Sequence, residues 1–256
     1  MSKPLILVTN DDGILAPGIR YLIKVMKTIG DVVVVAPDKP QSGMGHAITV
    51  FSPLRLHKHE NDPDIKEYSC SGTPVDCVKI AKDIILHRKP DLIVSGINHG
   101  SNASVNIIYS GTMSAALEGS MENIPSIGFS LLDHSQNADF THTEKYIKNI
   151  SENVLEKGLP DGVCLNVNFP KISEVPVKGV AVCRQARAYW KEEFDTRKDP
   201  HGSNYYWLKG IFENMDGGKD TDEYALSNNY VSIVPVNFDF TDYNTLSTIK
   251  KWNLDV

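Results

Sequence analysis

Apolar residues fall into two kinds of pattern along this chain. Short continuous apolar runs are typical of buried strands, whereas apolar residues that recur every three or four positions are typical of helices. Because the two kinds alternate over most of the chain, the pattern predicts an α/β fold built on βαβ units, with a mostly parallel sheet. The strand-like runs lie at residues 5–8, 31–37, 91–95, 125–131, 164–169, 177–183 and 230–236, and helical spacing occupies residues 19–29, 75–85, 111–121 and 143–157. Residues 47–56 are predicted to be extended, residues 57–64 to form a polar loop, and a last helical segment to end at Trp252.

The alternation stops after Arg184. Residues 185–228 are polar with scattered aromatic side chains, and they contain two stretches rich in turn-forming residues, KDPHGSN and NMDGGKDTD. This composition predicts a projecting hairpin or arm, and exposed aromatic residues on such an arm indicate an interface. We therefore expect a single domain over residues 1–256, with a core at 1–184, the arm at 185–228, and a late strand with a C-terminal tail at 229–256.

The composition narrows the function classes. Of 256 residues, 41% are hydrophobic and 23% are charged, and the net charge of −6 comes without a Lys/Arg-rich block. That balance argues against binding to a nucleic acid polymer. The first residues, MSKPLILV, do not resemble a signal peptide, and no apolar run is long enough to span a membrane, so we expect a cytoplasmic protein without membrane contact. The four cysteines form no C-x-x-C pair, which indicates reduced thiols rather than a zinc site.

Polar residues directly follow three of the strand-like runs. Asp11 and Asp12 lie in NDDG after the first run, Ser42 lies in DKPQSGMGH after the second, and Asn98 lies in GINHGSN after the third. Ligands bind at the carboxyl ends of the strands in open α/β sheets, so we expect these residues to converge. Two carboxylates, a hydroxyl and an amide carbonyl suit a hard divalent ion such as Mg²⁺ or Mn²⁺. The alternative interpretation of the acid pair is a helix N-cap followed by a solvated turn residue.

A fourth loop leads into a helix at Ser110, Gly111 and Thr112. The free amides at a helix start, helped by the helix dipole, form an anion site. The alternative interpretation is a plain Ser/Thr cap. A metal ion beside an anion site is the usual apparatus for phosphoryl transfer to water. In that chemistry Asp11 orients or deprotonates the attacking water, or itself attacks phosphorus.

Longer stretches of the chain resemble a known family. The segments LVTNDDG, VVVVAPDKPQSGMGHAIT, CSGTPVDCV, PDLIVSGINHGSN and YSGTMSAALEG, and the late strand YVSIVPV, are similar in order and register to the SurE (survival protein E) family of 5'/3'-nucleotidases, over roughly residues 4–240. The resemblance implies a Rossmann-like α/β domain with helices on both faces of the sheet. It also implies a C-terminal hairpin and tail used in oligomerisation, so the expected assembly is a homodimer or homotetramer. The implied activity is hydrolysis of nucleoside 5'- and 3'-monophosphates to nucleoside and phosphate and, in some members, cleavage of short polyphosphate.

The same resemblance assigns roles residue by residue. It implies one divalent ion per subunit, magnesium or manganese, held by Asp11, Asp12, Ser42 and Asn98. It implies that the phosphate of the substrate is contacted by Asn102 and by the turn Ser110, Gly111 and Thr112. His99 matches a variable position and receives no role. His46 is interpreted as a loop-stabilising residue, with a general acid as the alternative.

Three other functions compete with this one. A dinucleotide-binding oxidoreductase needs G-x-G-x-x-G after the first strand, and this chain has NDDGILAPG there. A phosphatase with an aspartyl intermediate has D-x-D in its first loop, whereas the two acids here are adjacent. A non-catalytic nucleotide-binding protein is compatible with the sequence and is the main alternative.

Overall fold

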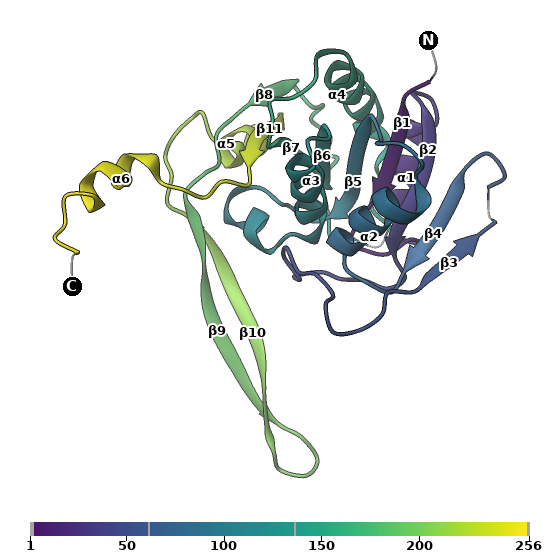
Figure 1. The fold of residues 1–256 in the computed structure, drawn as a ribbon. Coiled ribbons are helices and arrows are strands. Elements are labelled where there is room, and N and C mark those ends of the chain that lie inside the picture. Colours follow the sequence, from purple (N-terminus) through teal and green to yellow (C-terminus); the bar gives the residue numbers. More distant parts are fainter. Residues whose placement is uncertain (1–2, 61, 136, 255–256) are drawn as a thin grey trace.

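A nine-stranded sheet forms the centre of the molecule (Figure 1). The computed structural model describes residues 3–60, 62–135 and 137–254. Across the sheet the strand order is β3-β4-β2-β1-β5-β6-β7-β11-β8. The strands of this sheet are β1 Leu5–Thr9, β2 Asp31–Pro37, β3 Leu56–His59, β4 Lys66–Cys70, β5 Leu92–His99, β6 Ser126–Leu131, β7 Val163–Phe169, β8 Val180–Val182 and β11 Val231–Asn237.

Most of this sheet is parallel. The strands from β4 to β7 in the sheet order pair in parallel, whereas β3 pairs antiparallel with β4, and β11 pairs antiparallel with β7. Central parallel strands are covered on both faces, so they need apolar side chains at nearly every position. In β2, for example, every residue after Asp31 is buried. The predicted α/β class with a mostly parallel sheet is confirmed.

Helices cover both faces of the sheet. On one face, α1 and α4 pack around a core cluster that contains Val8 of β1. On the other face, α2 and α3 pack over a cluster that contains Leu7, whose side chain points the opposite way because neighbouring strand residues alternate. The helices are α1 Pro17–Met26, α2 Pro74–Ile80, α3 Gly111–Met121, α4 Glu144–Lys157, α5 Asp222–Ser227 and α6 Tyr243–Ile249, and the shorter helical turns are η1 Ala81–Ile85, η2 Ser104–Tyr109 and η3 Thr141–Thr143.

The sequence prediction was wrong at one edge of the sheet. The polar loop expected at 57–64 instead begins with strand β3, and β4 at Lys66–Cys70 was not foreseen. β3 is an edge strand whose residues are exposed or only half-buried, so it has no apolar run to reveal it. Residues 47–55, expected to be extended, form no strand. The strand expected at 177–183 is confined to β8, Val180–Val182.

The fifth strand is longer than the sequence indicated. The run at 91–95 was expected to end in a loop, but β5 continues to His99 after a register shift between Ser95 and Asn98. Gly96 lies at this shift with a φ of +128°, and a Cβ there would lie 2.3 Å from the carbonyl oxygen of Phe129. Only glycine fits both conditions. Asn98 is therefore carried by the sheet itself.

A two-stranded hairpin projects from the body (Figure 1). Its strands β9 Ala188–Lys198 and β10 Asn204–Asn214 pair with each other in a separate sheet. The projecting part is thus shorter than the arm expected at 185–228, because α5 packs back against β11 with Ala225 and Leu226 buried. The tail carries α6, which has no buried residue in the described structure.

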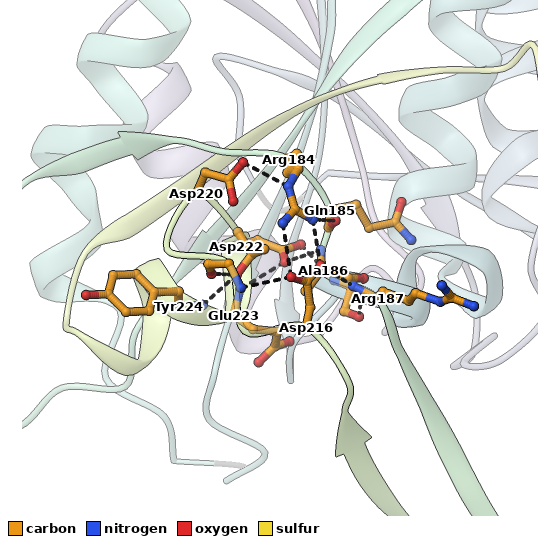
Figure 2. A network of polar contacts seen from close by, with 12 residues as sticks. Arg184, Gln185, Ala186, Arg187, Asp216, Asp220, Asp222, Glu223 and Tyr224 are labelled. Carbon is orange, nitrogen blue, oxygen red and sulfur yellow. Dashed lines mark hydrogen bonds and ion pairs between the residues drawn. The ribbon is translucent and has the colours of Figure 1, made fainter. Parts of the chain in front are cut away.

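Polar contacts fix the root of this hairpin (Figure 2). Arg184 binds Asp216 through two hydrogen bonds of 2.6 and 3.0 Å, and its Nε donates to Asp220 at 2.9 Å. Asp222 accepts hydrogen bonds from the backbone N–H groups of Ala186 and Ser104, both at 2.8 Å. The hairpin is therefore anchored to the η2 segment of the core. Within the three described ranges, no helix has the length and apolar character needed to cross a membrane.

Candidate active site

Asp11 lies directly after β1, against the first turn of α3. It is only 4% exposed, and its Oδ1 accepts a hydrogen bond from the Thr112 hydroxyl. Gly111 makes this approach possible, since a Cβ at that position would lie 2.7 Å from the Cβ of Asp11. The predicted convergence of the first and fourth loops is thus present in the structure.

Burial and mutual repulsion disfavour the charged form of the acid pair. Desolvation, followed by the charge of Asp12, raises the pKa of Asp11 to about 6, although the Thr112 hydroxyl and backbone N–H act in the opposite direction. Desolvation also raises the pKa of Asp12, against a hydrogen bond from the backbone of His99. A cation beside the pair would favour ionisation of both carboxylates.

The loop with Ser42 is tied to the same place. The N–H of Gln41 donates to the backbone carbonyl of Asp11 at 2.7 Å, and the N–H of Gly45 donates to the carbonyl of Tyr109 at 3.3 Å. Ser42 itself is exposed. The loop is therefore attached on one side to the NDDG turn and on the other to the segment that leads into α3.

Asn98 reaches the site from β5. The next residue, His99, donates its N–H to Asp12 Oδ2 at 3.2 Å, which brings the end of β5 against the acid pair. Asn98 Nδ2 donates to the carbonyl of Gly100 at 2.9 Å. Because its amide nitrogen is engaged, the amide oxygen is the atom with ligand capacity.

The expected phosphate contacts differ in how their side chains are used. Ser110 Oγ accepts from the N–H of Met113 at 3.0 Å, so Ser110 caps α3 as the alternative interpretation held. The Thr112 hydroxyl is directed to Asp11, and Asn102 Nδ2 donates to Ser130 Oγ at 2.8 Å. What the turn offers an anion is therefore the backbone N–H groups of the first helical turn.

His46 is engaged by a residue that the sequence analysis missed. Its Nε2 lies 3.0 Å from Oε2 of Glu118 on α3, and the other oxygen of Glu118 pairs with Lys79 of α2. Glu118 is buried, with 3% of its surface exposed, and joins the Ser42 loop to two helices. This geometry fits the loop-stabilising interpretation of His46. A sequence signal existed, since Glu118 is the single charged residue in the helical stretch GTMSAALEGSM.

His99 is also engaged within the protein. Its Nδ1 lies 3.0 Å from the carbonyl oxygen of Ser135, and its ring contacts Phe140 edge-on with centroids 5.2 Å apart. These contacts give the ring a packing role beside the site, in addition to the backbone N–H that reaches Asp12.

The four proposed metal ligands fit a hard divalent ion by their chemistry. Among the described residues, no group of three or more His, Cys, Asp or Glu side chains could hold a metal. The proposed ligand set differs in kind, because it combines the carboxylates of Asp11 and Asp12 with neutral oxygens from Ser42 and Asn98. Such a set leaves coordination positions for water and for a phosphate oxygen.

Comparisons with known proteins agree in sequence and in fold. A family model described as Survival protein SurE matches residues 6–192. The 5'-nucleotidase SurE of Christiangramia forsetii is 63% identical over 261 residues, covering 99% of this chain and 98% of that protein. The 5'-nucleotidase SurE of Flavobacterium psychrophilum is 62% identical over 256 residues, covering 100% of both chains. The crystal structure of the SurE protein from Aquifex aeolicus superimposes with a TM-score of 0.82 at 40% identity, covering 96% of this chain and 98% of that one. With most of the chain matched in both sequence and fold, this protein belongs to the SurE family.

Proposed function

We propose that this protein is a metal-dependent phosphomonoesterase that hydrolyses nucleoside 5'- and 3'-monophosphates to nucleoside and phosphate. The observation that carries the proposal is the acid pair at the carboxyl edge of the sheet, in which Asp11 is buried directly against the first turn of α3 and Asp12 beside it is half-buried. Acidic ligands and an anion-binding helix start are thereby adjacent, as hydrolysis of a phosphate ester requires. The names of the relatives, 5'-nucleotidase SurE, support the substrate class.

Asp11 is the residue that we assign to the reacting water. The hydrogen bond from the Thr112 hydroxyl fixes the orientation of its carboxylate at the start of α3. The N–H groups of Gly111 and Thr112 stabilise the equatorial oxygens of the phosphoryl group as negative charge builds up on them. The chain thus supplies a base directly beside an anion site.

The proposed cofactor is one divalent ion, magnesium or manganese, bound by Asp11, Asp12, Ser42 and Asn98. When bound, such an ion neutralises charge on the phosphoryl group and lowers the pKa of a water molecule. Ionisation of the acid pair is costly in the absence of a cation, so the two carboxylates are suited to binding one.

We also propose that the protein forms a homodimer or homotetramer through the hairpin and the C-terminal tail. The hairpin exposes large apolar side chains that a monomer would leave in water, among them Phe194 and Trp207, which are 67% and 58% exposed. The tail adds Phe240 and Trp252, which are exposed as well. Apolar surface of this kind, on an element that projects from the body, favours an interface with another copy.

The experiment that tests the function is a substrate panel with controlled metal. The chelator-treated protein is mixed with nucleoside 5'- and 3'-monophosphates, short polyphosphate or p-nitrophenyl phosphate, with and without Mg²⁺ or Mn²⁺, and phosphate release is measured. We expect metal-dependent release from the nucleoside monophosphates. Binding of nucleotides without release of phosphate under any condition would instead establish a non-catalytic nucleotide-binding protein, and full activity in the presence of chelator would refute the metal site.

A further inference from the structure

We propose that Asn166 and Asn168 of β7 are positioning residues for phosphate recognition, because their side chains fix the backbone of Asn102. This inference rests on the proposed function and on the contact with the substrate phosphate that the resemblance to the SurE family implies for Asn102. The three asparagines are 1%, 0% and 5% exposed, respectively, so water cannot supply the hydrogen bonds that they need. Asn166 and Asn168 lie two positions apart on one strand and so face the same side of the sheet.

The two side chains bind both polar groups of the Asn102 backbone. The N–H of Asn102 donates to Asn168 Oδ1 at 2.9 Å, and Asn166 Nδ2 donates to the carbonyl oxygen of Asn102 at 2.8 Å. Asn168 Nδ2 donates to Asn166 Oδ1 at 2.8 Å, which closes a ring of three hydrogen bonds. The side chain of Asn102 is fixed separately by Ser130 of β6, at 2.8 Å. Although Asn102 lies in a loop, its backbone and its side chain are both held by the sheet.

The ring has only one satisfactory arrangement of donors and acceptors. A backbone N–H can only donate, so Asn168 must present its oxygen to Asn102 and its NH₂ group to Asn166. Asn166 must then accept with its oxygen and donate to the carbonyl of Asn102, which can only accept. Rotating either amide by half a turn would place two donors or two acceptors face to face. The buried pair therefore specifies one position for Asn102.

The strand register connects this pair to the proposed metal site. Asn98 on β5 lies opposite Ser130 on β6, and Ser130 lies opposite Asn168 on β7. One row across the sheet thus contains the proposed metal ligand Asn98, then Ser130, which binds the Asn102 side chain, and then Asn168, which binds the Asn102 backbone. The spacing between Asn98 and Asn102 is then set by neighbouring strands of the sheet.

Neutral amides suit this position better than charged side chains. A carboxylate at position 166 or 168 would add negative charge behind a site that must attract a phosphate. At position 166 it could not donate to the Asn102 carbonyl, and at position 168 it could not donate to the side chain of Asn166. An amide supplies a donor and an acceptor with no net charge. The pair therefore orders the loop without weakening the attraction of the site for an anion.

The test compares binding of inorganic phosphate in four variants of the full chain. Asn166→Leu and Asn168→Leu remove the bonds to the Asn102 backbone without adding charge, and Ser130→Ala removes only the bond to its side chain. Val167→Ala is the matched control, since Val167 is buried in the same strand but belongs to the core cluster on the opposite face. Phosphate affinity is measured by titration calorimetry with Mg²⁺ present, the melting temperature by calorimetry, and KM and kcat with a nucleoside monophosphate.

We expect each Leu variant to bind phosphate about tenfold more weakly, because the backbone N–H or carbonyl of Asn102 loses its buried hydrogen-bond partner. KM should rise by a similar factor while kcat changes less, as expected when ground-state binding is lost. Ser130→Ala should weaken phosphate binding about threefold. Val167→Ala should lower the melting temperature and leave phosphate affinity within about twofold of wild type, because its cavity lies on the other face.

Several outcomes would overturn the proposal. Leu variants that melt earlier but bind phosphate as tightly as Val167→Ala would reduce the ring to a purely structural role. If the Leu variants fail to fold, Asn166→Ser and Asn168→Ser replace them, and phosphate affinity in both as tight as in Val167→Ala overturns the proposal. A wild-type protein that binds phosphate but hydrolyses no nucleoside monophosphate would refute the proposed function alone, because the comparison of phosphate affinities does not depend on turnover.

Discussion

Asp11 combines burial, a neighbouring carboxylate and a hydrogen bond from Thr112. At pH 8 the protein without metal must keep this carboxylate ionised in a dry environment, which destabilises the folded state. We therefore predict that Asp11→Asn abolishes turnover, because it removes the proposed base and a metal ligand, while the melting temperature without metal is unchanged or higher. The measurements are melting curves with and without Mg²⁺ and phosphate release from a nucleoside monophosphate.

Magnesium should stabilise the wild-type protein by mass action and Asp11→Asn much less. Asp38→Asn, which changes an exposed acid at the end of β2, serves as the control and should behave as wild type in both measurements. Near-normal turnover in Asp11→Asn would contradict the role given to this carboxylate.

Glu223, in the helix at the root of the hairpin, makes the stability of the fold depend on pH. Burial, followed by the charge of Asp222, raises the pKa of Glu223 from 4.5 to about 7. As the pH rises, the Glu223 carboxyl therefore loses its proton in the unfolded chain before it does so in the folded protein. The contribution of protonated Glu223 to the stability of the fold is complete below pH 4.5 and is lost as the pH rises through 7. We predict that Glu223→Gln melts with the wild type at pH 4 and is more stable at pH 8, by on the order of 1 kcal/mol after allowance for solvent screening. Calorimetric melts across this pH range make the comparison, and parallel profiles for the two proteins would contradict it.

At the scale of secondary structure elements, the strands that the sequence predicts are those buried on both faces. β1, β2, β5 and β6 are apolar runs because helices cover them on each side. The edge strand β3 and its neighbour β4 escape this signal, since β3 is not buried and β4 begins with the two charged residues Lys66 and Glu67. Glu67 is buried through an ion pair with Arg20 of α1, a tertiary contact that local sequence cannot reveal.

The strand ends that carry the candidate site could be located from the sequence, but the contacts between them could not. Strand ends marked by NDDG, by Ser42 and by Asn98 could be recognised because parallel strands bring their carboxyl ends to one edge. The bond between Thr112 and Asp11 spans 101 positions of sequence and depends on how closely α3 approaches β1, which Gly111 permits. The roles of Asn166 and Asn168 depend likewise on the path of a loop from another part of the chain.

The link between the Ser42 loop and two helices gives an element-level prediction. Glu118→Gln replaces a buried carboxylate that pairs with His46 and Lys79, and should lower the free energy of unfolding by about 1–3 kcal/mol. Loosening of this link should also speed proteolytic cleavage in the exposed loop at residues 38–46. The matched control is Glu122→Gln at the end of the same helix, whose pair with Lys82 is half-exposed and should contribute less than about 1 kcal/mol. Equal melting temperatures and cleavage rates in the two variants would contradict a special role for Glu118.

At the scale of the whole molecule, the hairpin is attached to the body mainly at its root, with one further hydrogen bond of 2.7 Å from Trp190 Nε1 to Asn106 of η2. Its strands pair only with each other, and its two ends meet where the N–H of Met215 donates to the carbonyl of Arg187 at 2.9 Å. On the side of that bond nearer the body, the network of Figure 2 fixes the chain through Arg184, Asp216 and Asp222. The sequence indicated an arm from its turn formers and aromatic residues, but its base could not be located, because α5 and these ion pairs return residues 216–228 to the core.

This separation allows the proposed interface to be removed without removing the fold. A chain in which residues 188–214 are replaced by a short Gly-Asn turn keeps the bond between Met215 and Arg187 and every contact of the root network. We predict that it folds and melts as one unit but gives a smaller particle in light scattering than the full chain, because the apolar side chains that favour association have been removed. Trp207→Glu in the full chain tests the same surface with the hairpin present. The exposed position 207 would be buried on association, and burying a charge there opposes association, so the particle mass should fall in this variant as well. An unchanged mass in both proteins would show that the copies associate through another part of the molecule or do not associate, and the exposed aromatic residues of the hairpin would then need a different partner.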